Sequence, residues 1–212
     1  LSPRRPIVLL PKREGAPVSE LVAPGLSLLG VMLPYTPLHY LLLRSTRDKF
    51  LIMTSGNRSG LPIVKDEVDA LEHLKGVADF FLVHNRRIVN RVDDSVVRVS
   101  DGHVVFLRRS RGYAPRWLRL PFKLPSTVVA LGAHLANTVS VAFKDRVVPS
   151  QYIGDVENLE NVEFQMEALD FLLKSYRINL ESSILASDMH PEYTTTKLAL
   201  KLAPDDERLI KV

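Results

Sequence analysis

The sequence of 212 residues contains no cysteine. Disulfide bridges, thiolate nucleophiles and cysteine-based zinc sites are therefore excluded for this chain, and the composition fits a reducing compartment, so we expect a cytoplasmic protein. Long apolar runs are also missing, because residues 31–43 are interrupted by Pro34, Thr36, Pro37 and His39 and fall short of the ~20 residues that a membrane helix needs. We expect no membrane partner.

A large excess of charge of one sign is absent as well. Lysine and arginine number 28 against 24 acidic residues, which gives a net charge of +4 at pH 7. This small positive net charge fits an enzyme that handles small anions such as nucleoside phosphates, and it also permits a nucleic-acid-binding surface. The first residues have neither a starting methionine nor the features of a signal peptide, and we interpret them as a cut edge.

Short apolar runs alternate with helical patterns in the first half of the chain. Residues 65–74 predict a helix, because apolar side chains recur along one face and Asp66 and Glu67 complement the helix dipole in the first turn. The apolar runs predict strands at 6–10, 50–53, 80–83, 95–99 and 103–107. Together they predict a mixed α/β fold.

A second pattern begins after residues 117–127, which carry two prolines and no periodicity and are typical of a linker. Here the apolar spacing predicts a strand at 127–132, a hairpin between 137 and 149 with its tight connection at 144–146, a helix at 157–176, a strand at 183–188 and a helix within 190–203. We therefore expect two domains.

The loop MTSGNRSGLPI, residues 53–63, follows the predicted strand at 50–53. Ligands of α/β sheets lie beyond the carboxyl ends of strands, where Ser55 and Asn57 would offer a hydroxyl and an amide. Gly56 and Gly60 would let backbone N–H groups approach an anion. The loop is thus a candidate phosphate or nucleotide site, and the alternative is an ordinary polar turn.

The run RRSRGYAP, residues 108–115, places three arginines within four positions directly after a predicted strand. Guanidinium groups bind phosphate or carboxylate through two parallel hydrogen bonds, so this run is a candidate anion clamp. A solvated surface and phosphate contacts to RNA are the alternatives.

Paired carboxylates form a third candidate. Asp93 and Asp94 are adjacent and would hold Mg²⁺ with a triphosphate, or they would cap a turn before the next strand. Asp188 and His190 follow the predicted strand at 183–188, where they would ligate a metal or form a hydrogen-bonded corner. The other histidines lack metal-ligand spacing, so we predict no metal site built from this chain alone.

A turn in the second half is the fourth candidate. Gly132, Asn137 and Thr138 lie in LGAHLANTVSV, where backbone amides would contact phosphates or would simply close a hairpin.

These motifs, in this order, resemble the HypF family of carbamoyltransferases, which act in nickel–iron hydrogenase maturation. The resemblance covers essentially the whole chain, and DDSVVRV followed by LRRSRGYAP and GDVENLEN is its most specific part. The segments that carry it are PGLSLLGVMLPYTPLHYLLL, MTSGNRSGLPI, ADFFLVHNRRIVNRVDDSVVRV, LRRSRGYAP, LGAHLANTVSVAF, SQYIGDVENLEN and DMHPEY.

The resemblance implies a fold and its divisions. Residues 1–118 would be the C-terminal part of a YrdC-like domain with a mixed twisted sheet, and residues 119–126 a linker. Residues 127–212 would be the truncated first lobe of an actin-like ATPase (RNase H-like) domain, akin to the transferases that place threonylcarbamoyl groups on tRNA.

The resemblance also implies site residues. The nucleotide-binding residues would be Thr54, Ser55, Asn57, Ser95, Arg108 and Arg111. Asn137 and Thr138 would form a phosphate turn of the second domain. The sequence departs from the family pattern at Ala136, where lysine is usual, and at Tyr152, where histidine is usual, and both positions bear on the transfer chemistry.

The implied reaction makes carbamoyl-adenylate from carbamoyl phosphate and ATP, with Mg²⁺, and passes the carbamoyl group to the C-terminal cysteine of HypE for cyanide-ligand synthesis. A metal ion in the second domain would take most of its ligands from outside this chain, and this chain alone would be incomplete as an enzyme. Two alternatives remain: a nucleotide- and RNA-binding protein like the tRNA threonylcarbamoyl-adenylate synthases, and a non-catalytic docking scaffold for HypE.

Overall fold

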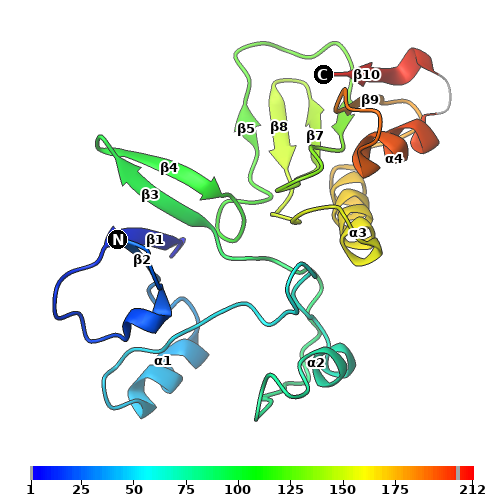
Figure 1. Ribbon diagram of the computed structural model, residues 1–212. Helices are drawn as coiled ribbons and strands as arrows, with labels where there is room; N and C mark the ends of the chain where they lie inside the picture. Colours follow the sequence, from blue (N-terminus) through cyan, green and yellow to red (C-terminus); the bar gives the residue numbers. More distant parts are fainter. Residues whose placement is uncertain (1, 204–205) are drawn as a thin grey trace. The chain divides into compact units, whose positions relative to one another are not determined.

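The computed structural model describes residues 2–203 and 206–212, which form two compact units (Figure 1). Unit 1 comprises Leu1–Ser55 and Asp94–Tyr113, and unit 2 comprises Gly56–Asp93 and Ala114–Val212. The two units thus interleave along the sequence. Within the described ranges, no helix has the length and apolar character needed to cross a membrane.

Unit 1 is built on a four-stranded mixed sheet with the order β2-β1-β3-β4. Its strands are β1 (Ile7–Pro11), β2 (Leu28–Val31), β3 (Val96–Ser100) and β4 (His103–Arg108). Strand β1 runs antiparallel to β2 and parallel to β3, and β3 and β4 form an antiparallel hairpin. Asp101 and Gly102 close that hairpin with positive φ angles of 49° and 76°, which suit a tight two-residue turn. The predicted strands at 6–10, 95–99 and 103–107 are confirmed.

Unit 1 also contains elements that the sequence pattern did not predict. Helix α1 (Pro37–Ser45) begins where the Thr36 hydroxyl accepts a hydrogen bond from the backbone N–H of His39, with proline in the first turn. A short 3-10 helix, η1 (Glu20–Val22), precedes β2. Helix α1 was not predicted because Pro37 was interpreted as an interruption of the apolar run, whereas it occupies the first turn of the helix.

The predicted strands at 50–53 and 80–83 are wrong. Both segments lack regular secondary structure, and Ile52 and Phe80 are largely exposed. A strand forms only where a neighbouring strand takes its hydrogen bonds, and neither segment finds such a neighbour within the described residues. The helix predicted at 65–74 is confirmed as α2 (Glu67–His73), in unit 2. Its N-cap, Asp66, accepts from the backbone N–H of Asp69, and that bond is the largest cause that lowers the pKa of Asp66.

Unit 2 holds a six-stranded sheet with the order β10-β9-β6-β7-β8-β5. The strands are β5 (Leu118–Arg119), β6 (Val128–Ala130), β7 (Ser140–Phe143), β8 (Arg146–Pro149), β9 (Ile184–Ser187) and β10 (Leu209–Lys211). Strand β6 is parallel to β9 and antiparallel to β7, so the C-terminal ends of β6 and β9 lie at one edge. The strands and the hairpin predicted for this half are confirmed.

The segment predicted as a linker contributes a short strand, and its role as a linker stays a prediction. Strand β5 pairs antiparallel with β8, and the backbone N–H groups of Leu120 and Leu124 donate to the carbonyls of Asp145 and Lys144. Its two prolines do not interrupt this pairing because it involves only Leu118 and Arg119. The predicted domain bounds, 1–118 and 127–212, stay predictions.

Helices α3 (Leu159–Tyr176) and α4 (Thr194–Leu202) confirm the two helices expected in unit 2. The hydrophobic core lies between α3, α4 and the sheet, and its buried members are Val129, Leu131, Val139, Val141, Val148, Ile153, Phe164, Ala168, Leu169, Leu172 and Ala199. Among the described residues, Val97 is the one hydrophobic side chain of unit 1 that is buried to the same degree. Burial is therefore concentrated in unit 2, which holds that half of the structure more firmly.

Gly132 is essential to the turn after β6. It has a φ of 72°, and a Cβ placed there would collide with the carbonyl oxygen of Thr138 and lie 2.9 Å from Nδ2 of Asn137. Backbone cannot yield as the end of a flexible side chain can, so any other residue at this position would strain the turn.

We predict that Gly132→Ala lowers the stability of unit 2 by about 3 kcal/mol, from the left-handed φ and the collision with backbone together. The matched control is Gly76→Ala, in the same unit with a φ of 80° but open space around the added Cβ. It should cost only about 1 kcal/mol. Thermal unfolding followed by circular dichroism measures both, and equal losses would contradict the collision.

Candidate functional site

Arg111 lies at the centre of the polar network of unit 1. Its Nε donates to Oδ1 of Asp94 at 2.5 Å, and its two terminal nitrogens donate to the carbonyls of Arg4 and Arg5 at 3.0 and 2.6 Å. The guanidinium also stacks on the ring of Tyr35, 3.4 Å from the ring centroid. Only a planar group with several fixed donors satisfies all these partners at once.

Ser95 extends this network into the sheet. The side chain is fully buried, and its Oγ accepts from the backbone N–H of Ser110 at 2.8 Å and donates to the carbonyl of Arg111 at 3.0 Å. The hydroxyl therefore ties the start of β3 to the residues that follow β4. Arg108, half-buried at the end of β4, lies opposite Val96 in the strand register.

The surroundings shift two ionisation equilibria. Burial raises the pKa of Tyr35 above its ordinary value, and the negative charge of Asp94 adds to that effect. Burial also lowers the pKa of Arg109, and the positive charge of Arg4 adds to it. Arg4 itself lies over the ring of Tyr113 at 4.6 Å. Arg4 and Arg109 thus bring positive charge to this part of unit 1, and positive charge favours an anion nearby.

The geometry assigns structural contacts to three residues that were considered for ligand binding. Ser95 and Arg111 form hydrogen bonds with other protein groups, as described above. Their roles as nucleotide ligands stay predictions. A magnesium site at Asp93 and Asp94 stays a prediction, and the carboxylate of Asp94 accepts from Arg111. The sequence alone could not show this, since an arginine and an aspartate 17 positions apart carry no pairing signal.

The loop at 53–63 presents polar groups of two kinds. Thr54 and Ser55 are exposed, and the Thr54 hydroxyl donates weakly to the carbonyl of Ser55 at 3.3 Å. The Asn57 amide is half-buried and donates from Nδ2 to the carbonyls of Arg58 and Leu61 at 3.0 and 3.1 Å, which closes the loop on itself. The units divide between Ser55 and Gly56, so Thr54 and Ser55 belong to unit 1 and Asn57 to unit 2.

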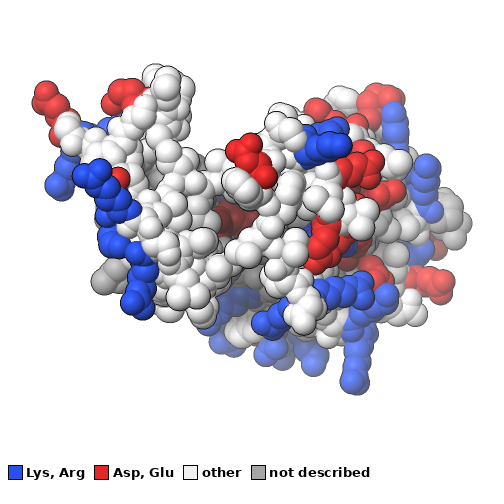
Figure 2. Space-filling model, turned by 90° about the horizontal axis from the view of Figure 1, so that it is seen from below, with Lys and Arg blue, Asp and Glu red and all other residues white. Residues whose placement is uncertain are grey.

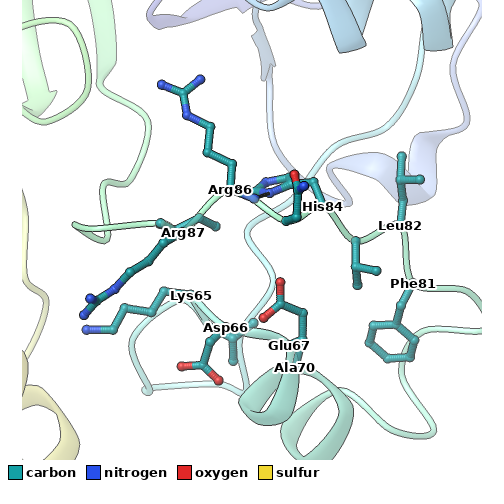
Figure 3. Close-up of a pocket in the computed structure, with 13 residues that line it drawn as sticks. Lys65, Asp66, Glu67, Ala70, Phe81, Leu82, His84, Arg86 and Arg87 are labelled. Carbon is teal, nitrogen blue, oxygen red and sulfur yellow. Dashed lines mark hydrogen bonds between the residues drawn. The ribbon is translucent and has the colours of Figure 1, made fainter.

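A hollow of about 530 Å³ in unit 2 lies beside α2. It is lined by residues 64–67, Ala70 and residues 81–88, of which 84–87 are polar and the rest apolar. Figure 3 shows the carboxylate of Glu67 pointing into the hollow and the guanidinium of Arg86 pointing out of it. Nδ1 of His84 accepts from the backbone N–H of Arg86 at 3.1 Å, which fixes the imidazole at the rim. The apolar and polar spacing did not predict this hollow, although the polar run HNRR at 84–87 within it was a detectable signal.

The turn after β6 uses its amides to hold itself together. Asn137 is buried, and its Nδ2 donates to the carbonyls of Leu131 and Ala133 at 2.9 and 2.5 Å while its backbone N–H donates to Gly154 at 2.8 Å. The backbone N–H of Ala136 donates to Oδ1 of Asp155 at 2.7 Å. Asn137 thus shapes the turn, and its predicted phosphate contact, like that of half-buried Thr138, stays a prediction.

The end of β9 forms a corner beside that turn. Asp188 accepts from the backbone N–H of His190 at 2.8 Å, which agrees with the hydrogen-bonded alternative. The ring of Tyr193 stacks on both His134 and His190, at centroid distances of 5.0 and 4.2 Å. In the part of the chain that the structure describes, no three His, Asp or Glu side chains are placed to hold a metal ion.

Charge of neither sign dominates the visible surface. Figure 2 shows basic and acidic side chains on the same face, with much of that face belonging to neither. Basic side chains gather along the lower edge of this view (Figure 2), and RNA binding stays an alternative.

Comparison with known families divides the chain into two matches. Residues 2–110 match the Sua5/YciO/YrdC family, whose description is telomere recombination. Residues 123–212 match a family described as the HypF Kae1-like domain.

Curated relatives match nearly the whole chain at once. The chain is 41% identical to the probable carbamoyltransferase HypF of Methanocaldococcus jannaschii over 96% of its length, and 42% identical to the carbamoyltransferase HypF of a Synechocystis species over 92%. The chain belongs to the HypF family. It spans about a quarter of these HypF relatives, 26% and 25% of their respective lengths.

Solved HypF structures show the same fold. The T. kodakarensis HypF structure matches with a TM-score of 0.92 and 45% identity, and the match covers 99% of this chain and 27% of that one. A full-length HypF in a phosphate- and nucleotide-bound form matches with a TM-score of 0.88 and 40% identity, covering 99% of this chain and 32% of that one. The expected YrdC-like and Kae1-like, or actin-like ATPase, folds are therefore confirmed.

We predict that Arg111→Lys destabilises unit 1 by about 2 kcal/mol, because an ammonium group cannot reach Asp94 and two carbonyls while stacking on Tyr35. The control is Arg98→Lys on the exposed side of β3, which should change stability by less than about 0.5 kcal/mol. Urea unfolding monitored by fluorescence compares them. A loss no larger for Arg111→Lys than for Arg98→Lys would show that the network is dispensable.

Proposed function

We propose that this chain is a part of a HypF carbamoyltransferase that makes carbamoyl-adenylate from carbamoyl phosphate and ATP and passes the carbamoyl group to the C-terminal cysteine of HypE for cyanide-ligand synthesis. The observation that carries the proposal is the succession of the two family matches in one chain, together with relatives named as carbamoyltransferases. The cytoplasm is the proposed location, because a chain without cysteine fits a reducing compartment.

The proposed adenylation asks for positioning and charge stabilisation. Water releases phosphate from carbamoyl phosphate, an oxygen of the resulting carbamate bonds to the α-phosphorus of ATP, and pyrophosphate leaves with the electron pair of the broken P–O bond. No covalent bond to the protein is required, so hydroxyl, amide and guanidinium donors suffice. Mg²⁺ would accompany the phosphates of ATP and offset their charge.

The loop at 53–63 is the part of this chain that we assign to the nucleotide. Thr54 and Ser55 are exposed hydroxyls, and Asn57 holds the loop in one shape. Support for a nucleotide comes from the relative crystallised in a phosphate- and nucleotide-bound form, which is 40% identical to this chain. Arg108 and the guanidinium groups of Arg4 and Arg109 supply positive charge in unit 1.

The alternative, a tRNA threonylcarbamoyl-adenylate synthase-like protein, draws on the match of residues 2–110 to the Sua5/YciO/YrdC family alone. This alternative does not account for the match of residues 123–212 to the HypF Kae1-like domain. We therefore place HypE, carbamoyl phosphate and ATP ahead of RNA as partners.

We predict that the full-length parent releases pyrophosphate from ATP when carbamoyl phosphate is supplied, and not when threonine and bicarbonate are supplied instead. A coupled pyrophosphate assay measures both. Equal release with threonine and bicarbonate would favour the tRNA alternative.

We predict that Asn57→Ala in the full-length parent weakens ATP binding by about 1–3 kcal/mol, the cost of leaving a polar partner unpaired. Isothermal titration calorimetry measures the affinity. Gly60→Ala is the control for loop shape, because it strains a φ of 78° without removing the amide. An unaltered affinity in Asn57→Ala would remove this residue from the site, and an equal loss in Gly60→Ala would assign the effect to loop shape.

A further inference from the structure

Helix α3 holds the loop of residues 57–65, here called the glycine loop, within unit 2. The carbonyl of Gly60 accepts two hydrogen bonds, from Nδ2 of Asn158 at 3.1 Å and from Nδ2 of Asn161 at 2.8 Å. Asn158 is the N-cap of α3, and Asn161 is buried in its first turn. The tip of the glycine loop is therefore fixed to the start of a helix that lies about 100 residues further along the sequence.

Two turns further along α3, Glu167 fixes the other end of the glycine loop. Its carboxylate accepts from Nζ of Lys65, at 3.0 Å on Oε1 and 2.9 Å on Oε2. Arg91 donates from Nη1 to the same carboxylate at 2.9 Å and from Nε to the carbonyl of Ile63 at 2.9 Å. Glu167 thus reaches the glycine loop directly through Lys65 and indirectly through Arg91.

The spacing on the helix makes this a continuous seam. Asn158, Asn161, Phe164 and Glu167 recur every three residues, and the guanidinium of Arg91 lies 5.6 Å from the ring centroid of Phe164. Neighbours three apart on a helix lie next to each other, so these side chains form a row that winds around α3 over about two and a half turns. Asn158, Asn161 and Glu167 contact the glycine loop itself, and Phe164 contacts Arg91.

The side chains of Lys65 and Arg91 are more shielded from solvent than that of Glu167, which pairs with both. The side chains of Lys65 and Arg91 are 23% and 16% exposed, whereas that of Glu167 is 50% exposed. A single exposed ion pair contributes little, but one carboxylate that neutralises two shielded cations bound to the same loop has a larger effect. Removing the charge of Glu167 would take from Lys65 and Arg91 the carboxylate that both contact, and would leave Asp66, whose charge also interacts with both, as their remaining acid.

We propose that Glu167 is a positioning residue for nucleotide binding: through Lys65 and Arg91 it holds the glycine loop, and with it Asn57, in the shape that receives the nucleotide. This inference rests on the proposed function, which assigns the nucleotide to the 53–63 loop. It means that a helix within the Kae1-like match controls a binding loop within the YrdC-like match.

The test compares Glu167→Gln with Glu163→Gln in the full-length parent. Glu163 lies one turn earlier on α3, and with Glu167 and Arg91 it lines a hollow of about 220 Å³ beside the glycine loop. Among the described residues Glu163 makes no ion pair. We expect Glu167→Gln to raise the KM for ATP in pyrophosphate release about tenfold with little change in kcat, which is the size of a typical coupling between sites. Glu163→Gln should leave both values unchanged.

Hydrogen exchange of the backbone amides in residues 57–65 supplies a readout independent of turnover. It should quicken about tenfold in Glu167→Gln and not in Glu163→Gln, because only the first releases the glycine loop. Lys65→Met should have the same effect, and the double variant Lys65→Met/Glu167→Gln should add little, since both act through one contact.

The outcomes separate the two proposals. A parent that neither binds ATP nor releases pyrophosphate overturns the proposed function, and the positioning role with it. A parent that is active but shows the same KM and exchange for Glu167→Gln as for Glu163→Gln overturns the positioning role alone. Faster exchange without a change in KM likewise overturns it, because the contact would then be merely structural.

Discussion

Helix α3 makes the contacts on which much of unit 2 depends. Phe164, Leu169 and Leu172 belong to the core beneath the six-stranded sheet. Asn158, Asn161 and Glu167 are directed at the glycine loop. The same rigid element therefore serves both parts of the unit, because a helix presents successive side chains in different directions. A loop held in this way is less mobile than one attached only at its two ends, and its binding groups lose less entropy when a ligand arrives.

The sequence predicted those elements whose apolar spacing coincides with real burial. Residues 159–176 fold as the expected helix, and the hairpin of β7 and β8 lies where Asp145 marks its turn. The strands expected at 50–53 and 80–83 failed for the opposite reason: their apolar residues satisfy the pattern, but pairing depends on a neighbouring strand, which a local pattern cannot supply. Helix α1 was missed because Thr36 and Pro37, which start it, were interpreted as interruptions.

The sequence predicted which polar segments the candidate site contains, but not which hydrogen bonds their side chains form. The sequence indicated a polar loop at 53–63 and an arginine cluster after β4, and both exist. It could not indicate that the Ser95 hydroxyl forms hydrogen bonds with two backbone groups, or that Asn137 is buried within its own turn. Residue type and spacing reveal which groups are able to bind a phosphate. Only the folded structure reveals which of them the protein already uses, because those hydrogen bonds join residues distant in sequence.

The contact between α3 and the glycine loop suggests why the two family regions occur in one chain. An adenylate is a reactive intermediate, and its value to a transferase depends on delivery before water hydrolyses it. Under the proposed function, a helix of the Kae1-like region shapes the nucleotide loop, and the state of the second region then alters the first through a rigid element rather than through diffusion. The coupling free energy must then be reciprocal, so nucleotide on the loop also stabilises α3 in its place on the six-stranded sheet. Two separate proteins would have to form this contact anew at every encounter, at the entropic cost of association.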